Sequence, residues 1–198
     1  MAYDGGRFSH RYAQSNTLSL PKTFQAVIID TPVASGSIHS PYKQPVGLRL
    51  ARGGLAVAYG MKAAHAVDPV VSSVSYRAGE VRVVLGGLGS GGLTAAVGSV
   101  GFEVLGNCSG TTLCWHSSPI AAASASGVVS LTSLPDAPRA VRYLWYLAPY
   151  GVQPFRAPVY ANAAPIRLES AGAPHPAAAR PGQDDEELLP LGPFVLPL

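Results

Sequence analysis

Charged side chains are scarce in this chain, since Asp, Glu, Lys and Arg make up only 13% of its 198 residues and the formal net charge is +3. The basic residues are scattered and form no run interleaved with aromatic side chains, which argues against a nucleic-acid-binding surface. The sequence also has no apolar run of the roughly 18 residues that a membrane-spanning helix needs. Because no basic segment followed by an apolar stretch starts at Met1, we expect neither a signal peptide nor a membrane span in the sequence as written.

Cysteine is equally rare, with Cys108 and Cys114 as the two residues of this type. They flank a short polar segment and could either close a small loop or stay as free thiols. The five histidines, at positions 10, 39, 65, 116 and 175, fall in different predicted elements. No His or Cys pair has the spacing of a helical or zinc-knuckle ligand pair, so we predict neither a metal nor a cofactor.

Apolar residues, in contrast, are plentiful at 47% of the chain, and the mean hydropathy is +0.22. Enough apolar surface is therefore available for one domain or two small ones. After about Gly60 the pattern changes to short extended runs between Gly, Ser, Asn and Pro turns, which predicts an antiparallel β-sandwich over residues 65–169. The predicted strands are Pro69–Tyr76, Glu80–Leu85, Leu93–Ser99, Gly101–Leu105, Thr112–His116, Gly127–Thr132 and Val141–Leu147.

Residues 1–64 have a different pattern, which is typical of part of an α/β domain. The apolar spacing predicts a helix over Arg7–Leu18 and a buried strand over Phe24–Ile29, which ends at Asp30. A single strand has no partner of its own. The missing strands must therefore come from a longer protein, of which this is a C-terminal portion, or from a separate chain.

A second helix is predicted from Pro45, a residue suited to a first helical turn, to Gly60, a residue suited to the position after a helix end. Lys43, Arg49 and Arg52 are expected to form its solvent-facing side. His39 then lies in the loop between the predicted strand and this helix. From position alone, His39 is either a surface imidazole or a functional residue at the carboxyl end of a strand.

Residues 170–198 are rich in Ala, Pro and Gly and contain the acidic cluster Asp184–Glu187. This composition predicts a disordered tail. The apolar end, Leu191–Leu198, could dock on another surface, but a low-complexity extension is the preferred interpretation.

The string Ile38-His39-Ser40-Pro41-Tyr42-Lys43-Gln44, preceded by A-V-I-I-D and followed by a helix ending in L-A-V-A-Y-G, resembles the last catalytic block of the sialate O-acetylesterases. That block typically reads I-H-P-x-x-K-Q. The resemblance implies an SGNH-type serine esterase with a three-layer α/β/α fold, which removes O-acetyl esters from sialic acids. It implies that His39 is the general base, and that Lys43 and Gln44 anchor the loop. An R-Y-x-W string at Arg142–Trp145 extends the resemblance to about residue 168.

Two features depart from the pattern of that family. The triad carboxylate usually stands three residues before the His, where this sequence has Gly36, so that Asp30 is the nearest substitute; a structural cap or a solvated turn is an equal alternative for Asp30. The family's nucleophile block contains Q-S-N, which recurs around Ser15. Because Ser15 lies inside a helical pattern, we reject it as the nucleophile and expect the missing N-terminal part of the esterase domain to be a partner.

The resemblance also bears on the cysteines, the location and the rival function. It favours a Cys108–Cys114 disulfide over free thiols, and a lysosomal or secreted location. The alternative function is a non-catalytic β-sandwich that binds carbohydrate or protein. If Trp115, Tyr143 and Trp145 line a solvent-facing groove, the binding function gains support. If they are buried, the sandwich is a scaffold.

The glycine-rich segment Gly86–Gly92 lacks the Lys-Ser/Thr of a phosphate-binding loop and is interpreted as a hairpin loop.

Overall fold

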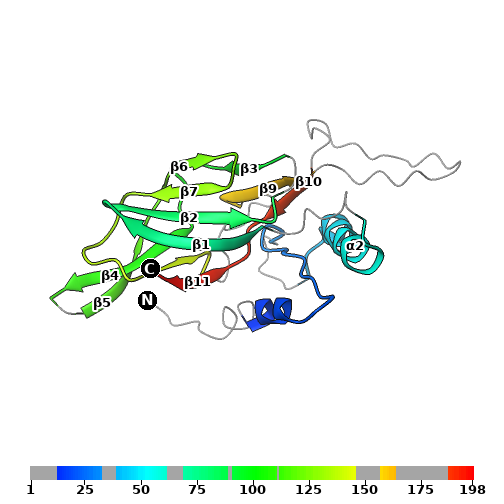
Figure 1. Ribbon diagram of the computed structural model, residues 1–198, viewed down its shortest axis with the longest axis horizontal. Helices are drawn as coiled ribbons and strands as arrows, with labels where there is room; N and C mark the ends of the chain where they lie inside the picture. Colours follow the sequence, from blue (N-terminus) through cyan, green and yellow to red (C-terminus); the bar gives the residue numbers. More distant parts are fainter. Residues whose placement is uncertain are drawn as a thin grey trace, which may run out of the picture.

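The protein is mostly antiparallel β-structure (Figure 1). The computed structural model describes residues 13–32, 39–61, 69–88, 91–110, 112–145, 157–163 and 187–198. The helical elements are η1 (Asn16–Ser19), a turn of 3-10 helix, and α2 (Lys43–Tyr59). The strands are β1 (Val70–Arg77), β2 (Glu80–Gly86), β3 (Leu93–Ala95), β4 (Phe102–Ser109), β5 (Thr112–Ser117), β6 (Ile120–Ser124), β7 (Val128–Leu131), β8 (Ala140–Tyr143), β9 (Val159–Ala163), β10 (Glu187–Pro190) and β11 (Phe194–Pro197).

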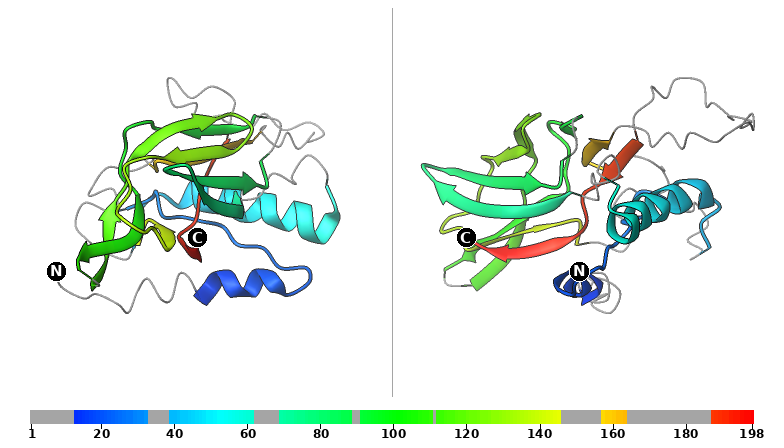
Figure 2. Two further views of the ribbon diagram at one scale, coloured as in Figure 1. Left: turned by 60° about the vertical axis from the view of Figure 1, so that its left-hand side comes forward. Right: turned by 45° about the vertical axis from the view of Figure 1, so that its right-hand side comes forward.

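The strands form three sheets, with the orders β1-β2-β7-β6, β11-β8-β4-β5 and β10-β9-β3. Every strand pair among the described residues is antiparallel. The two four-stranded sheets are stacked face to face (Figure 2). These strands confirm the antiparallel, β-rich structure that the sequence predicts for residues after Gly60.

Alternation of side chains explains why these runs are strands. In β2, Val81, Val83 and Leu85 are buried, whereas Arg82 between them is exposed. Successive side chains of a strand point to opposite faces of its sheet, so this order directs the apolar side chains into the space between the sheets. The turn before β2 has positive φ at both Ala78 (52°) and Gly79 (79°), as a two-residue hairpin of type I′ requires.

An aromatic cluster fills the core on the side of the second sheet. The ring of Phe102 lies 4.6 Å from that of Tyr143 and 6.3 Å from that of Phe194, measured between centroids. Phe102 and Tyr143 are fully buried. Aromatic pairs at these distances stabilise a core beyond their buried area alone.

For residues 187–198, the C-terminal strands correct the prediction of a disordered tail over residues 170–198. β10 pairs with β9 and β11 pairs with β8, so each strand extends a sheet formed by earlier residues. Leu189, Leu191 and Phe194 are buried in the core. Burial of these side chains and pairing of the backbone offset the entropy cost of ordering these strands, although the composition of the tail predicts disorder. Residues 170–186 lie outside the described part.

The predicted helix ending at Gly60 is confirmed as α2, which is followed by Gly60 in the left-handed conformation (φ 64°). Its predicted solvent side is wrong for Arg49 and Arg52, which are buried at 5% and 1% exposure, whereas Lys43 is exposed as predicted. α2 packs closely on the segment before it, so that a Cβ atom at Gly53 would overlap the Phe24 ring.

The predicted strand Phe24–Ile29 is an extended segment without strand pairing in the structure. Its inner side chains, Val27 and Ile29, are buried, but the carbonyl of Val27 accepts a hydrogen bond from the Arg49 side chain instead of from a neighbouring strand. Of the predicted helix Arg7–Leu18, residues 13–15 are helical and continue into η1, and residues 7–12 lie outside the described part. No helix in the described ranges is long and apolar enough to cross a membrane.

Candidate active site

His39 lies in the loop that leads into α2, and its side chain is exposed. Two local hydrogen bonds shape this loop: the Tyr42 N–H donates to the Ser40 Oγ at 3.2 Å, and the Lys43 N–H donates to the Pro41 carbonyl at 2.9 Å. Such turns give the chain a defined entry into the helix. The structure therefore presents the imidazole of His39 to solvent at the N-terminal end of α2. Gly36, the usual carboxylate position of the family, lies outside the described residues.

Asp30, the second predicted site residue, is fully buried. Its two carboxylate oxygens accept a bidentate pair of hydrogen bonds from the Arg49 guanidinium, at 2.7 and 2.8 Å. The Tyr160 hydroxyl donates to Oδ2 of the same carboxylate at 3.1 Å. The hydrogen bonds of Asp30 thus go to Arg49 and Tyr160 rather than to His39.

Tyr160 completes this buried cluster from strand β9. Its hydroxyl oxygen accepts a hydrogen bond from the Ala157 N–H at 2.8 Å while it donates to Asp30. Burial, and then the adjacent negative charge of Asp30, raise the pKa of the Tyr160 hydroxyl well above its usual value. Tyr160 is therefore a neutral donor across the physiological pH range.

The Asp30–Arg49–Tyr160 cluster joins three parts of the chain that are distant in sequence: the extended segment, α2 and β9. Removing one member of a buried ion pair leaves an uncompensated charge and costs about 3 to 5 kcal/mol. The cluster therefore ties α2, through the extended segment, to β9 of the three-stranded sheet. Because the loop of His39 continues directly into α2, the cluster also positions the loop.

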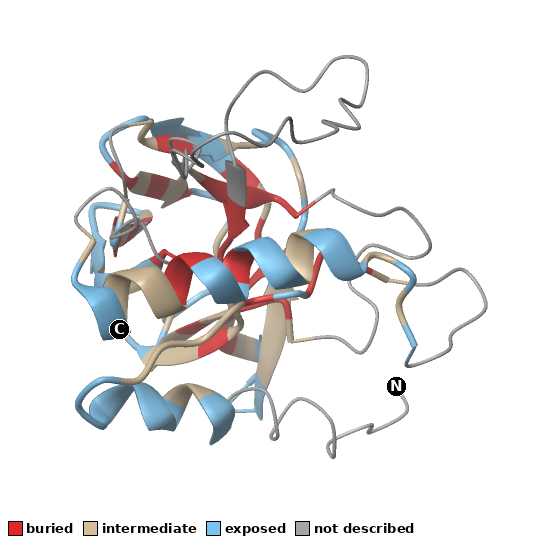
Figure 3. Cartoon of the chain, turned by 90° about the vertical axis from the view of Figure 1, so that its right-hand side faces the viewer, coloured by how far each residue is buried: buried red, intermediate tan, exposed pale blue. Residues whose placement is uncertain are grey.

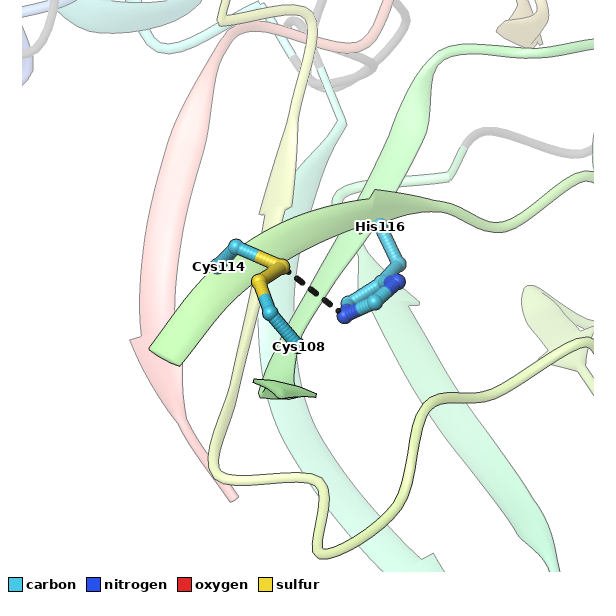
Figure 4. A group of neighbouring side chains, drawn as sticks. All are labelled: Cys108, Cys114 and His116. Atoms are coloured by element: carbon cyan, nitrogen blue, oxygen red, sulfur yellow. Dashed lines mark hydrogen bonds between the residues drawn. A yellow bond between two sulfur atoms is a disulfide. The ribbon is translucent and has the colours of Figure 1, made fainter. Parts of the chain in front are cut away.

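A second group of titratable residues lies on the β4–β5 hairpin (Figure 4). Cys108 and Cys114 form a disulfide, and the His116 side chain points toward it. The His116 Nε2 atom lies 3.1 Å from the Cys114 Sγ and 3.1 Å from the Asn107 carbonyl oxygen. A carbonyl only accepts hydrogen bonds, so Nε2 carries the proton and donates.

The two sulfur atoms and the His116 nitrogen all lie within 4.8 Å of one another. Thiolates and imidazole are ligands that suit zinc. In the disulfide form the sulfur atoms are bonded to each other, so the group could hold an ion only after reduction. Sequence spacing alone did not reveal this group, because the antiparallel pairing of β4 with β5 brings Cys108 to its partners.

The aromatic side chains that could form a sugar-binding platform do not lie together in an open groove. Tyr143 is fully buried in the core, while Trp115 and Trp145 are half-buried. The guanidinium of Arg142 stands 4.2 Å above the ring centre of Trp115 and is bonded to Glu103 at 2.7 Å. The face of Trp115 is therefore engaged in a cation–π contact, and Tyr143 belongs to the core.

Comparison with solved structures relates this arrangement to an enzyme. A carbohydrate acetylesterase from Xanthomonas citri matches 93% of the chain with a TM-score of 0.59 and 26% sequence identity. This chain resembles part of an acetylesterase. It spans about a third of that enzyme, since the match covers 34% of the acetylesterase chain. No family model matches the sequence, and a search of curated proteins finds no relative. The likeness supports a relationship to esterases at a general level.

Sequence reasoning located His39 and Asp30 but missed Arg49 and Tyr160, the two partners of Asp30. Arg49 follows the helical repeat of the predicted polar side, so the pattern favoured solvent for it. One signal was present: Asp30 ends an apolar run, where a charge without a partner would be costly. A search for a nearby basic residue could have indicated Arg49.

Proposed function

We propose that this chain is the histidine-bearing part of a carbohydrate O-acetylesterase of the SGNH type, with O-acetylated sialic acid or a related acetylated sugar as substrate. The observation that carries this proposal is the match of 93% of the chain to a carbohydrate acetylesterase. His39 within the I-H-S-P-Y-K-Q block adds the residue that such chemistry requires. The proposed fold of residues 1–64 is the end of a three-layer α/β/α domain whose other strands this chain does not contain.

In the proposed reaction, a serine hydroxyl attacks the carbonyl carbon of the acetyl ester while His39 accepts the hydroxyl proton. The tetrahedral intermediate collapses, and His39 returns the proton to the departing sugar oxygen. Water then attacks the acetyl-serine ester, again with His39 as the base, and acetate leaves. The nucleophile comes from a part of the esterase outside these 198 residues. Ser15, which we rejected from the sequence, has helical backbone angles and directly precedes η1.

For Asp30 we propose a positioning role instead of a direct partnership with His39. Its carboxylate already accepts three hydrogen bonds from Arg49 and Tyr160. A triad carboxylate must orient the imidazole and stabilise its charged form. In this proposal Asp30 orients the imidazole indirectly, by holding α2 and the loop before it.

Hydrolysis of 4-nitrophenyl acetate by the purified chain tests where the nucleophile lies. We expect no more than weak hydrolysis, and no change in rate for His39→Ala. A matched control is His116→Ala, which removes a half-buried imidazole remote in sequence from the proposed site. Robust turnover that His39→Ala abolishes and His116→Ala preserves would show that the nucleophile is among these residues, against the proposal.

A further inference from the structure

Helix α2 buries two arginines and exposes several of its apolar side chains. Arg49 and Arg52 are 5% and 1% exposed, whereas Leu48, Leu50 and Tyr59 are 52%, 49% and 79% exposed. Helices on the surface of a globular protein normally direct their charges to water and their leucines to the core. An outward apolar side of this kind indicates a surface that is covered when the protein functions.

The remaining outward positions of α2 carry small side chains. Gly47, Ala51, Gly54 and Ala58 lie along the side opposite the buried arginines, and a Cβ atom at either glycine would meet no atom within 4 Å. Figure 3 shows α2 across the front of the molecule with much of its outward side exposed. Charge on this side is limited to Lys43 at the first helical residue. Small residues at these positions let another backbone or large apolar side chains approach closely.

Apolar side chains are also exposed on η1 and on the extended segment that packs on α2. Leu18 and Leu20, in and after η1, are 41% and 58% exposed, and Ile28 of the extended segment is 46% exposed. Figure 3 places η1 on the same side of the molecule as α2. Exposed apolar side chains are thus present beyond α2 on this side of the molecule.

We propose that the outer face of α2, formed by Gly47, Leu48, Leu50, Ala51, Gly54 and Ala58, docks on the α/β body of an esterase that carries the serine nucleophile. The identity of this partner rests on the function proposed above. Two observations select it. The matched acetylesterase has about two thirds of its chain without a counterpart in this one, since the match covers 34% of it. His39 leads into the N-terminal end of the same helix, so a partner on the outer face also borders His39.

The direct test joins the two parts as separate chains. The probe is the Xanthomonas citri acetylesterase without the third that this chain matches, and its affinity for the purified chain is measured by titration calorimetry. We expect binding that Ala51→Glu weakens at least about 100-fold, because the carboxylate would be buried without a partner. Val100→Glu is the matched control, since Val100 is 62% exposed on the sandwich, and it should leave the affinity unchanged.

A hybrid protein covers the case in which the truncated acetylesterase does not fold. In this hybrid, the present chain replaces the matched third of the Xanthomonas citri enzyme within one polypeptide. Ala51→Glu should lower the melting temperature of the hybrid and leave that of the isolated chain unchanged, whereas Val100→Glu should change neither. His39→Ala should reduce hydrolysis by the hybrid without changing its melting temperature, which separates the docking proposal from the proposed function.

Three results would overturn the docking proposal. The first is binding, or hybrid stability, that Ala51→Glu and Val100→Glu affect equally. The second is loss of stability in the isolated chain on Ala51→Glu, which would mean that the outer face is already packed. The third is concentration-dependent dimerisation of the isolated chain in sedimentation velocity that Ala51→Glu abolishes, which would identify a second copy as the occupant.

Discussion

Helix α2 and strand β2 follow opposite rules for the same residue types. β2 buries Val81 and Val83 and exposes Arg82 between them, while α2 buries Arg49 and exposes Leu50. The difference comes from what lies opposite each element. β2 faces an apolar sheet, whereas α2 faces the Asp30 carboxylate, which makes burial of an arginine favourable. A helix with its arginines directed to an acidic partner and with exposed apolar side chains on its outer side fits the docking that we propose for α2.

The largest effect is expected from breaking the charge pair beneath α2. Asp30→Ala leaves the Arg49 guanidinium buried without its carboxylate and should lower the free energy of unfolding by about 3 to 5 kcal/mol. Urea denaturation followed by circular dichroism measures this value. Arg82→Ala on exposed β2 surface is the control and should stay within about 0.5 kcal/mol of the wild type. Equal effects of the two variants would show that the buried pair does not hold α2.

Truncation of one leucine in each region sharpens the comparison. Leu131 in β7 is fully buried, and Leu131→Ala should cost about 2 to 5 kcal/mol through lost burial and the cavity it leaves. Leu48→Ala on the outer face should change the stability of the isolated chain by no more than about 0.5 kcal/mol. Thermal denaturation of both variants gives the comparison. A large loss for Leu48→Ala would mean that the outer face is packed within this chain.

The disulfide offers a smaller effect within the sandwich. Cys108 and Cys114 are separated by 6 positions, and closing so short a loop stabilises a protein by roughly 2 kcal/mol in the chain-entropy account. The double variant Cys108→Ser/Cys114→Ser should lose about that much in urea denaturation. Added dithiothreitol should destabilise the wild type and leave the double variant unchanged. Identical stability with and without reductant would contradict this expectation.

Tyr160 should make the stability depend on pH in the alkaline range. Its pKa is raised above the ordinary value of 10.0 in the folded state, so its contribution is fully present below about pH 10 and is lost as the pH rises further. Tyr160→Phe should remove this dependence and cost about 1 to 2 kcal/mol at neutral pH, since a hydrogen bond to a charged group is lost. Unfolding curves between pH 7 and about pH 11 would test both statements. An unchanged alkaline slope in the variant would assign the dependence to another group.

Local pattern was sufficient for much of the sandwich. The hairpin of β1 and β2 follows from alternating side chains on both sides of Ala78-Gly79, and both strands lie where the sequence predicts them. β6 was missed because its alanines at positions 121 to 123 are exposed and show no alternation. β9 and β10 pair with each other across a long stretch of chain, and nothing local to either strand indicates the other.

Only part of the candidate site could be predicted from the sequence, because the rest depends on contacts between residues that are distant in sequence. The position of His39 before a helix could be predicted, because Pro45 and Gly60 mark the helix ends. The helical pattern did not predict the burial of Arg49, because that burial depends on Asp30 and Tyr160, which folding brings to the inner side of the helix. The one local signal for it was the charge of Asp30 at the end of an apolar run. The period of the sequence distinguishes the two sides of a helix. When neither side is clearly more apolar than the other, the period does not show which side faces the core.

The esterase activity of the hybrid protein tests the central claim most directly. Its kcat/KM for 4-nitrophenyl acetate and for an O-acetylated sialic acid should exceed that of the isolated chain, and His39→Ala should lower it by at least about 100-fold, as expected for loss of a general base. His116→Ala should leave it unchanged. Full activity of the folded His39→Ala hybrid would contradict the assignment of His39 as the base, and with it the proposed function of this chain.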